Sequence, residues 1–153
     1  MKKLFVIANW MQGTALSGGD RIFIELVKRW KLQLNITLFL SKEGSAICQR
    51  HALGIINQRV WASDLMSRWG YFVDILYRTF NSMINAFSVK TIAGDIIFST
   101  SDFWPDSFPA LILKKRNPKI TWIAGFYLFA PKPWQKNSPY RGKRFLNGLL
   151  YWI

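Results

Sequence analysis

The sequence is poor in the residues that build disulfide frameworks, metal sites and acidic surfaces. It contains one cysteine, one histidine and 8 Asp and Glu residues in a chain of 153. The lone Cys48 excludes an intrachain disulfide scaffold and the usual cysteine-rich zinc sites, and it favours a reducing, hence cytoplasmic, compartment. Because the carboxylates form no metal-ligand pattern, we expect no bound metal and no resident cofactor.

Long hydrophobic runs are also missing. The longest nearly apolar segment, residues 120–131, has about 12 residues, whereas a membrane-spanning helix needs roughly 20. Two lysines precede the apolar residues 4–8 as in a secretory signal, but that run stops at Asn9, below the roughly 7 to 15 residues a signal needs. We therefore expect no transmembrane anchor and interpret residues 3–8 as a buried strand.

Negative charge is missing from the last third of the chain. The 21 basic and 8 acidic residues give a net charge of +13, and no carboxylate follows Asp106. Such a field attracts nucleic-acid phosphates, anionic lipid headgroups or phosphorylated substrates. A basic nucleic-acid-binding module is therefore one alternative, although no helix-turn-helix, zinc-finger or RNP motif is present, and a membrane-surface module without catalysis is another.

What the sequence does contain is the alternation of an α/β fold. Apolar runs predict strands at residues 3–8, 35–40, 55–61, 95–100 and 120–124, and amphipathic patterns predict helices starting at Gly18 and covering 43–52, 68–87 and 106–115. This order predicts a Rossmann-like parallel sheet flanked by helices. In helix 68–87 we expect one face to be buried and the polar residues, Asp74 and Arg78 among them, to lie opposite. The face expected to be buried consists of Trp69, Phe72, Val73, Leu76, Phe80, Met83, Ile84 and Phe87.

Another amphipathic pattern begins at Lys143 and runs to Ile153. We expect residues 1–142 to form one Rossmann-like domain. Residues 143–153 are expected to be the start of a truncated helix that leads to a missing second domain.

Two candidate sites follow predicted strands. The first is the Gly18-Gly19 pair at a helix N-terminus, where backbone amides bind phosphate or carboxylate; a plain tight turn explains the pair equally well. In the second, Ser101 and Asp102 follow strand 95–100, where α/β sheets bind ligands. Asp102 can orient a sugar hydroxyl or act as a base; alternatively, Asp102 and Asp106 are turn and helix-cap residues.

A third candidate is the proline-rich and aromatic segment 125–142, beyond the last predicted strand. Phe126 and Trp134 can stack on sugars and Lys132 can meet a phosphate, or these side chains only pack the loop. The remaining pair, Cys48 and His51, lies on one predicted helix without a separate base or oxyanion element, so we assign it no catalytic role.

The motif Gly18-Gly19-Asp20-Arg21, which opens a helix shortly after the first strand, resembles the glycine-pair region of GT-B glycosyltransferases of family 4. The stretch from Gly94 through Phe103 and Trp104, and residues 119–127, look like later strands of that family's N-terminal domain with their ligand-facing loops. Where many members place a histidine, this chain has Ser101-Asp102 and Gly125-Phe126.

The resemblance implies the acceptor-side domain of a two-domain, metal-independent enzyme. Such an enzyme transfers a sugar from a nucleotide-sugar to a glycan or a lipid-linked acceptor. It implies a second domain, carrying an E-x7-E motif, for most donor contacts. On the acceptor side, the position of Asp102 after strand 95–100 makes it our catalytic candidate. We further expect the chain by itself to transfer no sugar, and its basic surface to bind the inner face of an anionic membrane.

Overall fold

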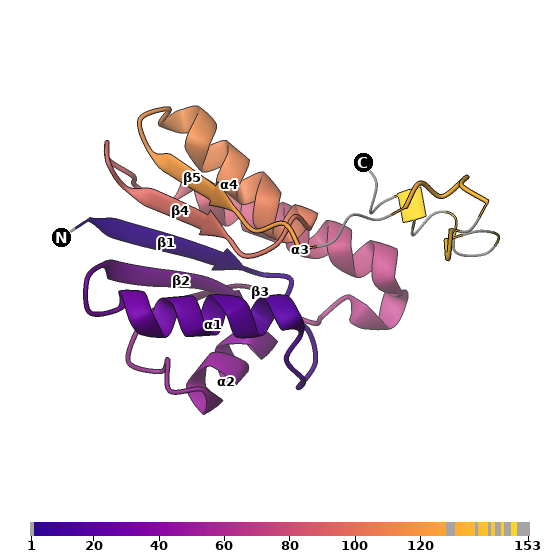
Figure 1. The fold of residues 1–153 in the computed structure, drawn as a ribbon, viewed down its shortest axis with the longest axis horizontal. Coiled ribbons are helices and arrows are strands. Elements are labelled where there is room, and N and C mark those ends of the chain that lie inside the picture. The colour runs from indigo at the N-terminus through magenta and orange to yellow at the C-terminus, as the bar shows by residue number, and fades with distance from the viewer. Residues whose placement is uncertain are drawn as a thin grey trace.

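The computed structural model describes residues 2–127, 131–136, 138–140, 142, 145, 148 and 149. Within them the chain forms a five-stranded, all-parallel sheet between helices, a Rossmann-like α/β fold (Figure 1). The predicted fold class and all five predicted strands are confirmed. In the order β3-β2-β1-β4-β5, the strands are β1 (Lys3–Ala8), β2 (Asn35–Ser41), β3 (Asn57–Ala62), β4 (Ile96–Ser99) and β5 (Thr121–Ala124).

The sheet is covered on both faces, which is why its central strands read as continuous apolar runs. Helices α1 (Gly18–Trp30) and α2 (Lys42–Arg50) pack on one face, where Phe23, Val27 and Ile47 join the core. Helices α3 (Tyr71–Phe87) and α4 (Trp104–Arg116) pack on the other face through small residues such as Ala86 and Ala110. The short 3₁₀ helix η1 (Ser67–Trp69) precedes α3.

The predicted packing of α3 is wrong. Six of the eight large apolar residues of the face expected in the core are 40–68% exposed in the structure, namely Trp69, Phe72, Val73, Phe80, Ile84 and Phe87. Leu76 and Met83 are half-buried. The face that packs inward carries Asp74, Arg78, Thr79 and Ser82, together with Ile75 and Ala86. Helix α3 is therefore inverted: its solvent face is apolar and its inward face is largely polar.

Two smaller expectations also fail. The helix starts at Tyr71 rather than at residue 68, because Gly70 adopts φ of +102°, a conformation that ends η1 and that other residues rarely adopt. Asp106 is not a helix cap: α4 begins at Trp104, its N-cap is Phe103, and the Asp106 side chain bonds another loop. Most of the helix expected at 143–153 lies outside the described residues.

Candidate functional site

A cavity of about 340 Å³ opens at the carboxyl ends of β1 and β4. These two strands are neighbours in the sheet, yet the chain moves from β1 towards β2 and β3 on one side and reaches β4 and β5 on the other. Parallel α/β sheets leave a crevice at such a switch point, because the connections on its two sides run in opposite directions. The cavity therefore occupies the position at which this class of fold binds ligands.

Asp106 is buried beside the cavity and holds two of its loops in place. Its carboxylate accepts hydrogen bonds from the backbone amides of Asn9 (2.6 Å) and Trp10 (3.1 Å), which follow β1. It also accepts from the hydroxyls of Ser101 (2.5 Å) and Thr100 (3.3 Å), which follow β4. One buried side chain thus ties together the two loops that line the cavity.

Aromatic rings form the cavity walls. Trp10 stacks on Phe103 with ring centroids 5.2 Å apart, and its edge meets Tyr71 at 5.4 Å. Across the cavity, the Tyr127 ring lies against Gly19: a Cβ added to that glycine would stand 3.1 Å from ring carbons Cδ2 and Cε2. The glycine thus permits close approach of a ring of this chain to α1.

A second glycine brings Tyr127 into place. At Gly125 a Cβ would stand 2.7 Å from the Thr100 carbonyl oxygen, so only glycine lets the chain leave β5 this close to β4. The Gly125 amide donates to the Ser99 carbonyl at 2.7 Å. The wall formed by Tyr127 therefore depends on this close backbone contact.

The charge of the cavity is opposite to that of the chain. Its described lining contains three carboxylates, from Asp20, Asp102 and Asp106, and no lysine, arginine or histidine. Asp20 also accepts a hydrogen bond from the Ser17 amide at 2.8 Å, and its own amide donates to the Ser17 hydroxyl, a capping box that places a carboxylate at the N-terminus of α1. The positive end of α1 therefore already faces a negative group.

Burial changes the acidity of several groups here. Complete burial raises the pKa of Asp106 to about 7, against the lowering effect of its four donors. Burial also raises the pKa of Asp102, which is half-buried in the cavity wall, while a backbone hydrogen bond opposes that change. Burial, followed by the charges of Asp20 and Asp106, raises the pKa of Tyr127. A carboxylate with a raised pKa is a better proton acceptor, and of these two carboxylates Asp102 is the one that is partly exposed in the cavity.

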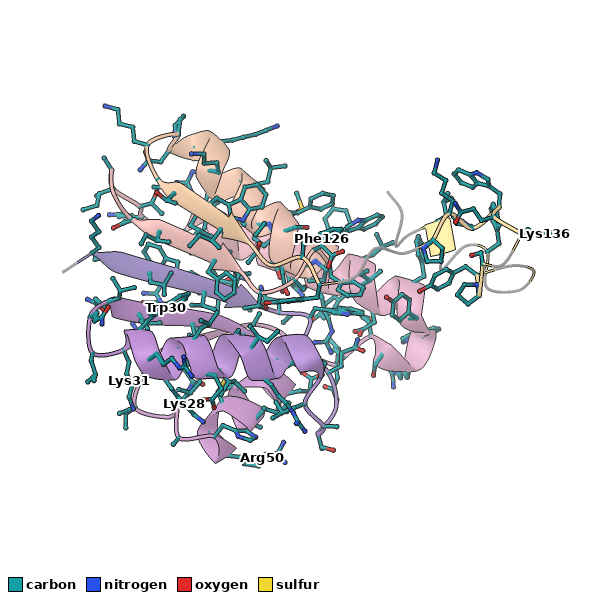
Figure 2. The ribbon with its side chains drawn as sticks, viewed as in Figure 1. Lys28, Trp30, Lys31, Arg50, Phe126 and Lys136 are labelled. Carbon is teal, nitrogen blue, oxygen red and sulfur yellow. The ribbon has the colours of Figure 1, made fainter. Side chains whose placement is uncertain are left out.

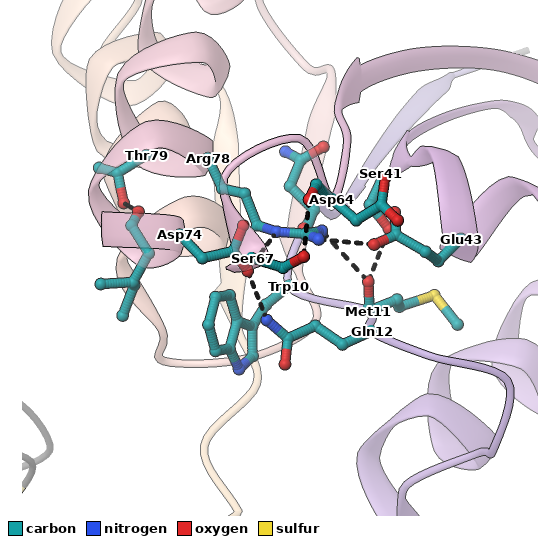
Figure 3. A network of polar contacts seen from close by, with 12 residues as sticks. Trp10, Met11, Gln12, Ser41, Glu43, Asp64, Ser67, Asp74, Arg78 and Thr79 are labelled. Atoms are coloured by element: carbon teal, nitrogen blue, oxygen red, sulfur yellow. Dashed lines mark hydrogen bonds and ion pairs between the residues drawn. The ribbon is translucent and has the colours of Figure 1, made fainter. Parts of the chain in front are cut away.

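Arg78 of α3 binds the same loop, and Figure 3 shows its guanidinium between Asp74, Glu43 and Met11. Its guanidinium pairs with Asp74 at 3.0 Å and with Glu43 at 2.6 Å, and it donates to the carbonyls of Asn9 (3.3 Å) and Met11 (3.4 Å). The arginine is 1% exposed, so these bonds replace water almost completely. The inward polar side of α3 thus holds the loop that follows β1 together with Asp106 of α4.

The structure brings together about half of the residues proposed from the sequence. Gly19, Asp20, Ser101, Asp102 and Phe103 line the cavity. The others are not among its lining residues: Gly18, Arg21, Trp104, Phe126, Lys132 and Trp134.

Those other residues have different surroundings. Trp104 opens α4 and stacks on Phe108 at 5.7 Å, and Arg21 is exposed on α1. Phe126 lies near the carboxyl end of the sheet, whereas Lys136, from the same segment as Lys132 and Trp134, lies well apart from the sheet (Figure 2).

Several lining residues were not proposed as site residues from the sequence, Trp10, Gln12 and Tyr127 among them. Trp10 and Gln12 directly follow the first strand, so the rule that ligands meet the carboxyl ends of parallel strands points to them. Tyr127 belongs to the aromatic segment 125–142, in which the sequence points to stacking rings without distinguishing it from Phe126. The Cys48–His51 pair stays without a role, because Cys48 is fully buried and burial raises its pKa to about 12.

Comparison with protein-family models, with curated proteins and with solved structures found no match for this chain. Among the described residues, no group of three or more His, Cys, Asp or Glu side chains is placed to hold a metal ion. No helix in the described part of the chain has the length and apolar character needed to cross a bilayer.

Proposed function

We propose that the cavity binds an uncharged sugar, and that the chain is the acceptor side of a glycosyltransferase. The observation that carries the proposal is the lining: aromatic walls together with carboxylates and hydroxyls, and no basic side chain among the described lining residues. The C–H faces of a sugar ring pack on aromatic rings, and its hydroxyls donate to carboxylates. A phosphate would instead meet Asp20 and Asp102 with no described cation of the lining to offset the repulsion.

In this proposal Asp102 acts on the acceptor hydroxyl. Its carboxylate accepts a hydrogen bond from that hydroxyl and takes the proton as the oxygen forms a bond with the anomeric carbon of the donor sugar. The bond from that carbon to the nucleoside diphosphate breaks, and the diphosphate leaves with the electron pair. Asp106 and Arg78 are positioning residues, because they hold the loops of the cavity and do not act on the sugar.

The donor diphosphate requires cations, which the described cavity lining does not provide. We therefore place the nucleotide-sugar on groups outside this cavity, as expected for a second domain in the GT-B arrangement. A cleft enzyme must hold both substrates at once, and such positioning accounts for roughly 7–11 kcal/mol of the barrier. Incubation of this chain alone with radiolabelled UDP- and GDP-sugars and acceptors should therefore give no transfer, and robust transfer would contradict this division of roles.

A binding measurement distinguishes a sugar site from a phosphate or nucleotide site. Saturation-transfer NMR should detect neutral oligosaccharides on the chain but not nucleoside diphosphates in the same cavity, and added inorganic phosphate should not displace the sugar signal. Asp102→Asn and Trp10→Ala should abolish the sugar signal, whereas the matched variants Asp64→Asn and Trp134→Ala, at exposed positions outside the cavity lining, should preserve it. Equal signals from both sets of variants, or a preference for nucleotides, would refute the sugar site.

A further inference from the structure

The outward face of α3 requires an explanation that a sugar-binding cavity does not provide. All five residues that the structure classes as exposed in this helix are apolar: Phe72, Val73, Phe80, Ile84 and Phe87. With Trp69 of η1 they form a continuous strip, here called the α3 face, along a helix about 25 Å long. Contiguous aromatic surface on this scale marks an interaction site.

The helix cannot rotate to hide this strip. Its opposite side holds Arg78, 1% exposed, in ion pairs with Asp74 of the same helix and Glu43 of α2. Rotation of α3 would separate Arg78 from Glu43 and replace the buried polar contacts with apolar ones. Breaking a buried ion pair costs free energy of folding. The polar anchors therefore fix the α3 face toward the outside.

Positively charged side chains lie at both ends of the α3 face. The Arg68 guanidinium lies over the Trp69 ring at one end, and Arg116 lies over the Phe87 ring at the other, each 5.7 Å from the ring centroid. Lys90 follows the helix and is exposed. Between residues 65 and 94 the only carboxylate is that of Asp74, and it is buried. The nearest exposed acid before this segment is Asp64.

We propose that the α3 face docks on the surface of a membrane that contains anionic lipids. The rings enter the boundary between headgroups and acyl chains with the helix lying in the membrane plane, and the flanking guanidinium and ammonium groups pair with lipid phosphates. In a typical interfacial helix the polar side faces water. Here the polar side of α3 packs against the rest of the domain, so the domain would lie on the membrane surface with α3 between the sheet and the bilayer.

The charges also argue against a second copy of this chain as the occupant. A symmetric pairing through the α3 face would bring Arg68, Lys90 and Arg116 of two molecules together, in a chain that already carries +13. Anionic headgroups neutralise the same residues. This proposal goes beyond sugar transfer and does not depend on it, because membrane binding is measured without any substrate.

Co-sedimentation of the full chain with vesicles tests the proposal. Vesicles of phosphatidylcholine and phosphatidylglycerol should retain the chain, pure phosphatidylcholine vesicles should retain much less, and added salt should weaken binding. The decisive variants are Phe80→Asp/Ile84→Asp, in the α3 face, and Leu32→Asp/Ile55→Asp, at exposed apolar residues of other loops. Both pairs change the net charge equally, so any difference between them reports the surface and not the total charge.

The α3-face pair should lose at least about tenfold in affinity relative to the control pair, because two apolar side chains leave the bilayer. Circular dichroism and thermal unfolding should show both variants folded, since all four positions are exposed. Equal affinities of the two variants would overturn the proposal, as would equal binding of the chain to neutral and anionic vesicles. A dimer dispersed by Phe80→Asp/Ile84→Asp, without vesicle binding, would assign the α3 face to a second copy instead.

Discussion

The two helical layers of this domain turn opposite faces of their helices toward the sheet: α1 turns its apolar face inward, and α3 turns a largely polar face inward. In α1 the buried residues are Phe23, Ile24 and Val27, and the charged residues Glu25 and Arg29 are exposed. In α3 the buried residues include Asp74 and Arg78, and the exposed ones are apolar. Both helices are amphipathic, so the period of a pattern gives the helix but does not say which face turns inward.

The difference lies in what the inward residues find on the sheet side. Buried charge is stable only when it is paired and hydrogen-bonded. Arg78 meets this condition through Asp74, Glu43 and two backbone carbonyls. Asp106 of α4 has four hydrogen-bond donors but no cation, and its burial still raises its pKa to about 7. The α1/α2 layer buries no charged residue within its helices. The polar layer is thus the one whose buried charged groups hold the loops of the cavity.

The largest expected effect comes from removal of the central charge of that layer. Arg78→Met leaves Asp74 and Glu43 without their cation and should reduce the free energy of unfolding by about 3–5 kcal/mol. The same substitution at the exposed Arg29 of α1 should cost less than about 0.5 kcal/mol. Urea denaturation of both variants measures the contrast, and equal costs would mean that Arg78 is not buried as described.

The second prediction concerns the pH dependence of the free energy of unfolding, to which Asp106 of the polar layer contributes. Because the folded-state pKa of Asp106 is about 7, above its ordinary value of 3.8, the folded chain keeps a proton that the unfolded chain has released. This contribution to stability is complete below about pH 4 and is lost as the pH rises to about 7, a change on the order of 4 kcal/mol. Asp106→Asn should remove this loss from the profile of unfolding free energy against pH.

Asp64→Asn, at an exposed carboxylate, is the control for that profile. It should leave the decline between about pH 4 and 7 as it is in the unmodified chain. If Asp106→Asn also left the decline unchanged, the Asp106 carboxyl would not be the group that titrates.

The smallest expected effect concerns the glycine pair at the start of α1. Gly19→Ala places a Cβ 3.1 Å from two Tyr127 ring carbons, while a Cβ at Gly18 meets nothing within 4 Å. Both variants should change the free energy of unfolding by less than about 1 kcal/mol. Only Gly19→Ala should displace the ring and weaken sugar binding, which titration with a neutral oligosaccharide would reveal; equal weakening by both would make the pair a simple turn.

The sheet could be predicted from the sequence because its strands are short apolar runs buried on both faces. Residues 3–8 were placed with the same ends that the structure shows for β1. About half of the cavity could be predicted for a related reason: Gly19 and Asp102 follow strands whose carboxyl ends meet at one edge of the sheet.

The rest depends on contacts between distant parts of the chain. Asp106 bonds the amide of Asn9, 97 residues away, and Arg78 bonds its carbonyl, 69 residues away, so neither role leaves a local pattern. The orientation of α3 left one faint signal. The small residues Thr79, Ser82 and Ala86 lie on its inward side, where the helix approaches its neighbours closely.

The orientation of α3 is the central claim, since both the cavity loop and the α3 face depend on it, and thiol labelling measures it directly. Phe80→Cys puts a thiol on the outward side, and Ser82→Cys, nearly isosteric, puts one on the inward side, where Ser82 is fully buried. The native Cys48 is buried and has a pKa of about 12, so it should not react with the reagent. We expect that, in the folded protein, a maleimide reagent labels the Phe80→Cys variant rapidly and leaves the Ser82→Cys variant protected. Rapid labelling of the Ser82→Cys variant together with protection of the Phe80→Cys variant would contradict it.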